Sequence, residues 1–530
     1  MALTLTNEQK AIVSTNDRKV VIKAGAGASK TTSLVEYAKA HPKERILYLA
    51  YNKAIKEEAD GRFPANVNIK TSHGAAMSEV GKYFSHKLTD SLRPQTVIEA
   101  LGLDKRLVLS TPIMARYAKK IVDIINRYLA STDEDIGHSH LQMNLSDPIE
   151  RQNFKPFDLL AHANEIWDKM TNPDDHSVPM LHDGYLKIFM LEKISIGRYD
   201  RILFDEGQDA NPVTLQILVN QNTPFILVGD NNQSIYGFRG AVDALQQFSD
   251  ATEYRLSGSF RFGPEIAMAA NRILLLKSSD DFIRGVGNGG QVLLQEREDA
   301  WRNLVGENER IMYLARGAFN LFAEAIIQAK LGRKISFCGD IKSYRFSRLD
   351  DIYKLFKKGI PADPFLRKFQ NYEDLKRYAV NDIDMEACCR LVEHYPNDLP
   401  EMIKLVQKAT TENQDEAQIL MSTAHKSKGL EMDTVVLSED FKGFSKDHYF
   451  GSSGEPKLLR SAQDVEEANV VYVAITRAKN KLILPFNARI LYENINITRQ
   501  LVAQVASMSH MQQTSPEVER HMANRRARSL

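Results

Sequence analysis

Short apolar runs, separated by segments of helical pattern, organise the first half of the chain. Four runs are rich in the β-branched and aromatic residues that favour strands: VVI (20–22), ILYLA (46–50), ILF (202–204) and FILVG (225–229). Runs that are apolar throughout are typical of strands buried on both faces, as in parallel sheets covered by crossover helices. The pattern therefore predicts an α/β domain with a parallel sheet.

A long stretch of helical pattern separates the second of these runs from the third. Apolar residues recur there at intervals of three and four positions, the spacing of one helix face, in AMSEVGKYF (76–84), ARYAKKIVDIINRYLA (115–130) and DLLAHANEIWDKM (158–170). We predict a helical insertion inside the first α/β domain.

The second half of the chain repeats this organisation. Its predicted strands are VLLQ (292–295), IMYLA (311–315), TVVL (434–437) and KLIL (481–484). NLFAEAIIQAK (320–330) has the helical spacing, and the segment from about Gly332 to Glu416 is mostly helical and charged. A second α/β domain with a smaller helical insertion is the economical interpretation.

These patterns divide the chain into four parts and a tail. We assign the first sheet domain to 1–74 and 196–255, its insertion to 75–195, the second sheet domain to 256–331 and 417–490, its insertion to 332–416, and a basic, flexible tail to 491–530.

The composition agrees with several soluble domains. A chain of 530 residues is too long for one hydrophobic core, and its 43% hydrophobic and 26% charged residues are an ordinary globular balance. It has no run of about 18 apolar residues and no secretory start in MALTLTNEQK. Cys338, Cys388 and Cys389 match neither a disulfide framework nor a zinc site, which fits a reducing compartment. The net charge of +1 requires any nucleic-acid binding to come from a local groove.

A phosphate-binding loop is the first candidate for chemistry. AGAGASKTT (24–32) follows a predicted strand and precedes a helix, and Lys30 and Thr31 match the Gly-x-x-x-x-Gly-Lys-Ser/Thr pattern. Ala24 and Ser29, however, occupy the two glycine positions. Lys30 would neutralise phosphate charge and the Thr31 hydroxyl would bind Mg²⁺. Taken alone, the segment fits an ordinary strand-to-helix turn equally well.

An acidic pair strengthens the nucleotide interpretation. Asp205 and Glu206, in RILFDEGQD, follow a predicted strand at the sheet edge where open α/β proteins bind ligands. Asp205 can hold Mg²⁺, and Glu206 can orient and deprotonate an attacking water. The alternative role for such a pair is to cap a helix N-terminus.

Six motifs in a fixed order resemble the UvrD/Rep/PcrA-like helicases of superfamily 1A. They are AGAGASKTT, FDEGQD, GDNNQSIYGFRGA, LSGSFRF, STAHKSKGLEMDTVVL and NVVYVAITRAK. AYNKAIKEEA, HDGYLKI and SFRFGPEIA are most similar to the helicase core of the F-box DNA helicase family, here expected without an F-box region before it. The resemblance runs from about Leu5 to Leu484. It implies an α/β fold with two RecA-like parallel-sheet domains, each with a mainly helical insertion.

The resemblance also implies roles around ATP and Mg²⁺. Glu206, Lys30, Gln233, Arg261 and Arg477 would be catalytic, with Gln233 sensing the γ-phosphate and Arg477 supplied by the second domain. Thr31 and Asp205 would bind the metal. The remaining nucleotide contacts would be Gln9 at the adenine, Glu431 near the ribose, Arg239 at the γ-phosphate, and the loop residues Ala24, Gly25, Ala26, Gly27, Ala28, Ser29, Lys30, Thr31 and Thr32.

A motor that steps along single-stranded DNA needs stacking platforms and backbone contacts rather than base-edge readout. The positions that resemble the family's DNA contacts are Tyr51, Asn52, Thr71, His73, Tyr236, Phe238, His425 and Lys428. Core packing is the alternative role for Tyr236 and Phe238. Two residues depart from the family, Ser72 where an aromatic is usual and Gly207 where alanine is usual.

The implied function is an ATP-driven, Mg²⁺-dependent DNA translocase or helicase of 3′–5′ polarity, acting in DNA repair or recombination control. Its partners would be single-stranded DNA, 3′-tailed duplex, and either recombinase filaments or another protein subunit. We expect no membrane association and a cytoplasmic location, at the nucleoid in a bacterium or phage and in the nucleus of a eukaryote.

Ser29 supports a rival, a helicase-like protein that binds DNA or partners without turnover; it could also be a deliberate substitution. If position 29 needs a left-handed backbone, a residue with a Cβ costs roughly 1 to 2 kcal/mol, or about a five- to thirtyfold loss of ATP affinity when the strain arises only on binding. We therefore expect a weakened but live site.

Overall fold

Two compact units make up the computed structural model. It describes residues 4–50, 53–145, 147–235, 245, 247–277, 279–339, 344, 346–379, 383–441, 444, 459, 461–494, 497 and 500. The first unit contains Met1–Ala24, Ser29–Leu256 and Asp340–Lys408, and the second contains Gly25–Ala28, Ser257–Gly339 and Ala409–Leu530. The chain therefore passes between the units several times.

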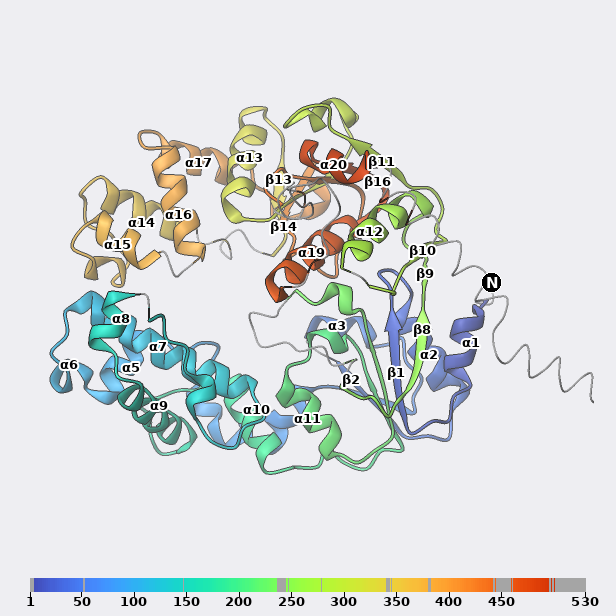
Figure 1. The fold of residues 1–530 in the computed structure, drawn as a ribbon, viewed down its shortest axis with the longest axis horizontal. Helices are drawn as coiled ribbons and strands as arrows, with labels where there is room; N and C mark the ends of the chain where they lie inside the picture. The colour runs from blue at the N-terminus through green and yellow to red at the C-terminus, as the bar shows by residue number, and fades with distance from the viewer. Residues whose placement is uncertain are drawn as a thin grey trace, which may run out of the picture. The chain divides into compact units, whose positions relative to one another are not determined.

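A six-stranded parallel sheet is the core of the first unit (Figure 1). Its strands, in spatial order, are β3 (Val67–Thr71), β2 (Ile46–Ala50), β6 (Arg201–Phe204), β7 (Phe225–Gly229), β1 (Lys19–Ala24) and β8 (Thr252–Leu256). β2, β6 and β7 are buried along their whole length, as expected for strands covered on both faces. All four predicted strands of this sheet are present.

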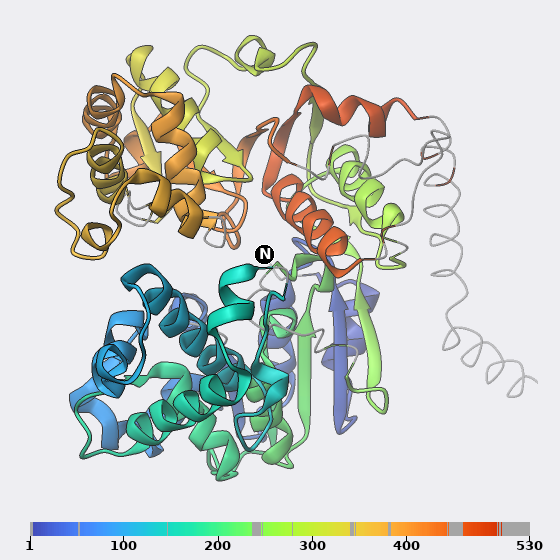
Figure 2. The same ribbon diagram turned by 60° about the vertical axis from the view of Figure 1, so that its left-hand side comes forward.

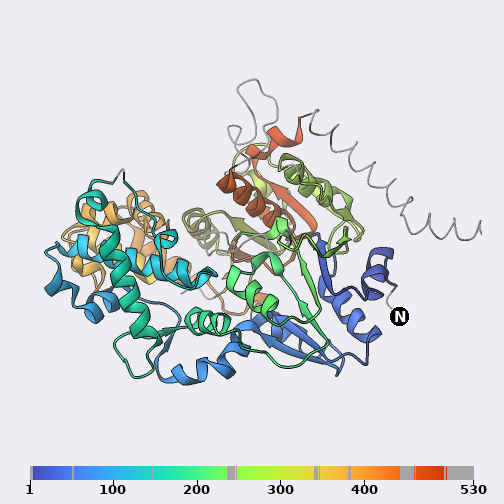
Figure 3. The same cartoon turned by 60° about the horizontal axis from the view of Figure 1, so that its bottom comes forward.

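Among the described residues, the α-helices that follow or precede these strands along the chain are α1 (Asn7–Val13), α2 (Lys30–Ala40), α3 (Lys53–Ala59), α4 (Ser72–Glu79) and α11 (Pro212–Asn220). α1 begins with a capping box in which Thr6 and Gln9 satisfy each other's backbone amides. It packs against α2, and Figure 3 shows this pair in blue.

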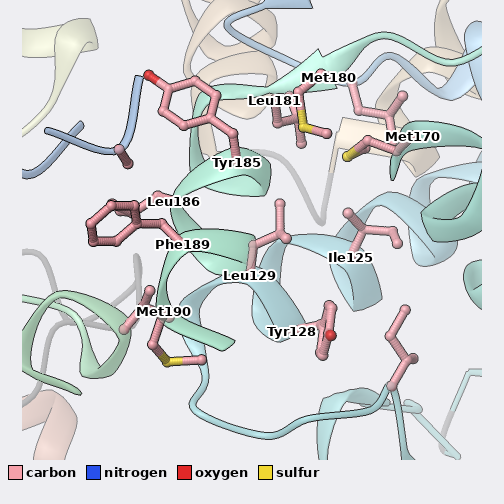
Figure 4. Close-up of a cluster of buried hydrophobic side chains, with 14 of the residues drawn as sticks. Ile125, Tyr128, Leu129, Met170, Met180, Leu181, Tyr185, Leu186, Phe189 and Met190 are labelled. Atoms are coloured by element: carbon pink, nitrogen blue, oxygen red, sulfur yellow. The ribbon is translucent and has the colours of Figure 1, made fainter. Parts of the chain in front are cut away.

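The helical segment between β3 and β6 shares one continuous hydrophobic core with the first sheet. Its helices are α5 (Pro94–Leu101), α6 (Leu103–Arg106), α7 (Thr111–Ala130), α8 (Pro148–Asn153), α9 (Pro156–Thr171) and α10 (His182–Leu191), with a short parallel pair β4 (Leu88–Thr89) and β5 (Met180–Leu181). α7 packs against α5, α9 and α10. Figure 4 shows part of this core, which includes Ile125 and Leu129 of α7 and Leu186 and Phe189 of α10.

A second group of helices is also counted with the first unit (Figure 2, orange). It comprises α14 (Phe346–Phe356), α15 (Tyr372–Ala379), α16 (Ile383–His394) and α17 (Leu399–Ala409). α16 packs against α14 and α15. The segment 332–416 also includes a short strand, β13 (Ile335–Phe337), which belongs to the second sheet. Our division of the chain into four parts stays a prediction.

The second unit contains another six-stranded parallel sheet, so the predicted fold class is confirmed. In spatial order its strands are β11 (Gln291–Leu294), β16 (Ala478–Leu484), β15 (Met432–Leu437), β12 (Ile311–Ala315), β14 (Ile419–Thr423) and β13. The helices of this unit are α12 (Pro264–Leu276), α13 (Ala318–Lys330), α19 (Ala462–Ile475) and α20 (Arg489–Tyr492), and β9 (Gly258–Ser259) pairs with β10 (Arg284–Gly285).

None of the helices in the described part of the chain is both long and apolar enough to cross a bilayer.

Candidate active site

The lysine of the phosphate loop lies at the start of α2. Ser29, at the N-cap, has φ 58° and ψ 44°, which is a left-handed backbone. The condition that we set for Ser29 from sequence is therefore met. The Lys30 ammonium, at the first residue of the helix, pairs with the Glu206 carboxylate at 3.0 Å.

Asp205 follows β6 at the same edge of the first sheet. The Thr31 hydroxyl donates to Asp205 Oδ2 at 3.0 Å, and the Tyr48 hydroxyl donates to the same oxygen at 2.9 Å. The Glu206 backbone amide donates to Asp205 Oδ1 at 2.9 Å. Burial and the neighbouring Glu206 charge raise the pKa of Asp205, which the positive charge of Lys30 opposes. Burial also raises the pKa of Tyr48, so its phenol stays protonated as a donor.

Glu206 is held in an unusual conformation between two partners. Its backbone is left-handed, with φ 55° and ψ 43°. Its carboxylate accepts from Lys30 and from the side-chain amide of Gln208. Burial lowers the pKa of Lys30, but the charges of Glu206, Asp205 and Asp230 outweigh burial and raise it overall. Lys30 is therefore a permanent cation beside the candidate base.

Gln208 connects this acidic pair to the end of the neighbouring strand, β7. It is fully buried, and its Oε1 accepts from the Asp230 amide at 2.9 Å. Asp230 in turn accepts from the Gln233 side chain at 2.8 Å. Sequence reasoning missed Gln208, although its place two residues after Glu206 in FDEGQD was a usable signal.

Thr31 and Asp205 offer the oxygen ligands that Mg²⁺ prefers. The described residues contain no group of three or more His, Cys, Asp and Glu side chains that could hold a metal ion. A hydroxyl and one carboxylate suit a Mg²⁺ ion whose other ligands are phosphate oxygens and waters. The residues present therefore fit a Mg²⁺–nucleotide complex rather than a separate metal cage.

The loop residues Gly25–Ala28 are counted with the second unit and pack against its LSGSFRF segment. Gly27 has φ 72°, and a Cβ there would lie 2.6 Å from Ser259 Oγ and 2.7 Å from Arg261 Cβ. The Phe260 amide donates to the Gly27 carbonyl at 2.9 Å. This position therefore favours glycine, which has no Cβ and adopts positive φ without strain.

Two predicted arginines have defined partners in the second unit. Arg261 donates to Glu431 at 2.7 Å and to the Thr476 carbonyl at 2.9 Å, so the structure brings Arg261 and Glu431 together beside Gly27. Arg477 is 1% exposed, and its guanidinium donates to the carbonyls of Val473 and Leu430 and to the Thr476 hydroxyl.

Two aromatic residues beside the loop were not predicted. The Phe260 side chain is 46% exposed, which is unusual for a large apolar group. The buried Tyr472 hydroxyl accepts from the Ala26 amide at 3.1 Å. Both residues lie inside motifs that we had recognised, but only the fold places them at the loop.

The other predicted nucleotide contacts lie at the loop or next to it. Ala24 ends β1, and Thr32 accepts from Arg62 at 3.5 Å. Gln9 is buried, caps α1 and donates to Ser33 Oγ at 3.4 Å, so it would have to exchange these bonds to contact adenine.

The predicted DNA contacts are only partly described. Thr71 caps α4, and His73 Nε2 lies 3.0 Å from the Asp183 carboxylate. His425 and Lys428 lie in the turn that follows β14 in the second unit. The remaining predicted contacts, Tyr51, Asn52, Tyr236, Phe238 and the phosphate-site residue Arg239, are outside the described residues.

Comparison with known proteins gives the family of this site. Residues 190–252 match the UvrD/REP helicase N-terminal domain, and residues 307–489 match the UvrD-like helicase C-terminal domain. The two matched segments hold the acidic pair of the first unit and Glu431 and Arg477 of the second. Over both segments the chain is similar to the UvrD-like superfamily 1 helicases.

Relatives of this chain include two eukaryotic proteins. It is 32% identical over 509 residues to F-box DNA helicase 1 of Gallus gallus, covering 91% of the chain and 49% of that protein. It is 31% identical over 522 residues to F-box DNA helicase protein 1 of Schizosaccharomyces pombe, covering 91% and 57%. DNA helicase II of Escherichia coli is 24% identical over 314 residues, covering 51% and 40%. The chain thus spans about half the length of the curated relatives it matches.

Proposed function

We propose that this chain hydrolyses ATP with Mg²⁺ and uses the energy to move 3′ to 5′ along single-stranded DNA. The observation that carries the proposal is the convergence of Lys30, Thr31, Asp205 and Glu206 at one edge of the first sheet. These are the groups that phosphoryl transfer needs, namely a cation, two metal ligands and a base.

The chain's own contacts suggest the order of events. The Lys30 ammonium pairs with Glu206. When ATP binds, it would leave Glu206 and pair with the phosphates instead. Glu206 would then be released to accept a proton from the attacking water, with Gln208 fixing its orientation. Thr31 and Asp205 would hold Mg²⁺, which neutralises phosphate charge when bound.

Single-stranded DNA and 3′-tailed duplex are the proposed substrates, with Thr71, His73, His425 and Lys428 among the contacts. Turnover in DNA repair or recombination control, beside either recombinase filaments or another protein subunit, is the proposed setting. The names of the relatives, which include DNA helicases, support DNA as the substrate. A cytoplasmic place at the nucleoid, or a nuclear one in a eukaryote, follows from that substrate.

The rival is a protein that binds DNA without turnover, and Ser29 is its support. The retained groups Lys30, Thr31, Asp205 and Glu206 favour turnover, because their geometry is compatible with one Mg²⁺–nucleotide complex. A left-handed serine strains the loop without removing any of these groups.

ATP hydrolysis measured with and without single-stranded DNA tests the proposal. We expect DNA-stimulated hydrolysis that Glu206→Gln lowers by about 10²- to 10⁴-fold, because the variant lacks the base but keeps its shape. ATP and DNA binding should persist, and ATP binding should not weaken, since Lys30 loses a competing partner.

Glu58→Gln is the matched control, because Glu58 is an exposed carboxylate that pairs with Arg62. It should hydrolyse ATP like the parent protein. Hydrolysis that is equal in the parent and Glu206→Gln would remove Glu206 from the mechanism, and no hydrolysis by the parent would favour the rival.

A further inference from the structure

Tyr48 lies in the middle of β2, in the interior of the first sheet. The side chain is fully buried, and its backbone is paired with Ile69 of β3 and Leu203 of β6. Its ring lies 4.6 Å from the ring of Phe63, centroid to centroid, at an angle of 42°. The ring is therefore fixed on both sides by the sheet and by an aromatic neighbour.

The hydroxyl of this fixed ring reaches Asp205. It donates to Oδ2 at 2.9 Å, the oxygen that also accepts from Thr31 at 3.0 Å. The Glu206 amide holds the other oxygen, Oδ1, at 2.9 Å. The carboxylate is thus anchored at both oxygens, by a phenol from the neighbouring strand and by an amide from its own loop.

The hydroxyls of Thr31 and Tyr48 would respond differently to a bound metal ion. Thr31 would itself become a ligand and would redirect its oxygen to the ion. Tyr48 is held by packing on a strand, so its bond to Asp205 can persist. A bond that persists fixes the carboxylate's orientation before the ion arrives, and second-layer donors of this kind typically tune metal affinity.

We propose that Tyr48 is a positioning residue that holds the Asp205 carboxylate in the orientation that binds Mg²⁺ with nucleotide. The inference rests on the proposed function of the site. Core filling alone is the competing role for a buried tyrosine. Tyr48→Phe separates the two roles, because it keeps the ring and its contact with Phe63 and removes only the hydroxyl.

The test measures binding rather than turnover. A fluorescent ADP analogue is titrated onto the full chain at a series of Mg²⁺ concentrations. In Tyr48→Phe the Mg²⁺ concentration for half-maximal binding should rise roughly three- to tenfold, the effect of losing one hydrogen bond. Binding without Mg²⁺ should not change, because the hydroxyl acts through the metal ligand.

Tyr37→Phe is the matched control. Tyr37 is also fully buried in the first unit, and its hydroxyl bonds Glu44 at 3.3 Å rather than an active-site group. The control should keep the parent's Mg²⁺ dependence. An unchanged Mg²⁺ dependence in Tyr48→Phe would overturn the inference while leaving the proposed function intact, whereas a parent protein that binds no nucleotide would overturn both.

A crystal structure of the parent chain with Mg²⁺ and ADP gives a second test that needs no variant and so does not depend on Tyr48→Phe folding. The inference requires the Tyr48 hydroxyl to remain within hydrogen-bond distance of Asp205 while Asp205 faces the ion. A Tyr48 hydroxyl that has moved out of that range would overturn it.

Discussion

At the scale of single residues, backbone strain surrounds the phosphate-site lysine. Ser29, immediately before Lys30, has φ 58°, and Glu206, which pairs with its ammonium, has φ 55°. Left-handed non-glycine residues each cost of order 1 kcal/mol or more and persist where the surrounding structure enforces them. Two such residues at the same ion pair agree with a site whose groups are held in place before the ligand binds.

Replacing Ser29 with glycine tests where that strain acts. Because the backbone of Ser29 is left-handed in the folded chain, its strain is a cost of folding. Ser29→Gly should therefore raise the free energy of unfolding by roughly 0.5 to 1 kcal/mol, the relieved strain less the entropy that glycine adds to the unfolded chain. ATP affinity should rise by less than the fivefold that strain on binding alone would give. Denaturant unfolding and nucleotide titration measure the two effects.

Gly27 is the opposite case, a position that tolerates no side chain. In Gly27→Ala, alanine would have to adopt the positive φ of Gly27, and its Cβ would clash with Ser259 and Arg261. We expect it to lower the free energy of unfolding by about 2 kcal/mol or more, beyond the 1 to 2 kcal/mol of strain alone, and to weaken ATP binding.

Gly102→Ala is the control for Gly27→Ala, because Gly102 has φ 58° and open space around its would-be Cβ. Gly102→Ala should lower the free energy of unfolding only by the backbone strain, because its Cβ meets no clash, and it should leave ATP binding unchanged. Equal losses of stability in the two variants would mean that the loop yields to the added methyl group.

The role of a site residue could be predicted from sequence where the residue belongs to a recognisable motif. It could not be predicted where the residue reaches the site only through the fold. Lys30, Thr31, Asp205 and Glu206 stand in motifs, and the structure places them together. Tyr48, in contrast, stands in the apolar run ILYLA, where a tyrosine indicates only burial. Its hydroxyl gains a role because β2 and β6 are neighbours in the sheet, and the order of strands cannot be obtained from local pattern.

At the scale of elements, central strands were predictable and several outer ones were not. β3 and β8 close the two edges of the first sheet and are only partly buried, so their sequences VNIKT and TEYRL lack an apolar run. β13 has only three residues, too few for a pattern. β14, in contrast, is nearly all buried, and our sequence analysis did not predict it.

The end of α7 depends on a buried charge from another helix. Lys187 of α10 is fully buried, donates to the carbonyls of Ser131 and Asp133, and lies 4.3 Å from the ring centroid of Tyr128. These carbonyls follow the last turn of α7, where backbone acceptors need partners. Burial lowers the pKa of Lys187 to about 8.

Lys187→Met should lower the free energy of unfolding at pH 7 by about 1 to 3 kcal/mol, because the carbonyls of Ser131 and Asp133 lose their donor. The parent's folded state binds the lysine proton less tightly than its unfolded chain, with pKa about 8 against 10.5. The parent should therefore gain stability relative to the variant as pH rises from about 8 toward 10.5, by about 2 kcal/mol at pH 9.5. Urea unfolding at pH 7 and pH 9.5 measures this.

Lys105→Met, on the exposed surface of α6, is the control for Lys187→Met and should show no such pH-dependent difference. If the free energies of unfolding of the parent and Lys187→Met differ by the same amount at both pH values, Lys187 keeps its charge up to pH 9.5. Burial would then not control its protonation.

At the scale of the whole molecule, the near-neutral charge limits how DNA can be bound. Sixty-nine basic residues are balanced by 68 acidic ones, so attraction to a phosphate backbone would have to come from local cations, among which we propose Lys428. If the protein neutralises few phosphates, its affinity for DNA will depend only modestly on salt. Binding of this kind suits a motor that must release and rebind the strand at each step, provided that ATP hydrolysis is coupled to the change in DNA affinity.

Directed movement is the property that separates the proposed motor from a DNA-binding rival. Streptavidin bound to biotin at one end of a single-stranded oligonucleotide blocks a protein moving toward that end. A 3′–5′ translocase should displace streptavidin from the 5′ end, only with ATP and Mg²⁺, and leave streptavidin at the 3′ end in place. The measurement is the fraction of free oligonucleotide over time for the two labelled ends.

Glu206→Gln controls for displacement by binding alone, since it should bind the same DNA and displace streptavidin from neither end. Displacement from the 3′ end would reverse the polarity but keep the motor. DNA-stimulated hydrolysis without displacement from either end would mean that ATP turnover is not coupled to stepping, and the 3′–5′ translocase would then be the wrong function even though the ATP site is active.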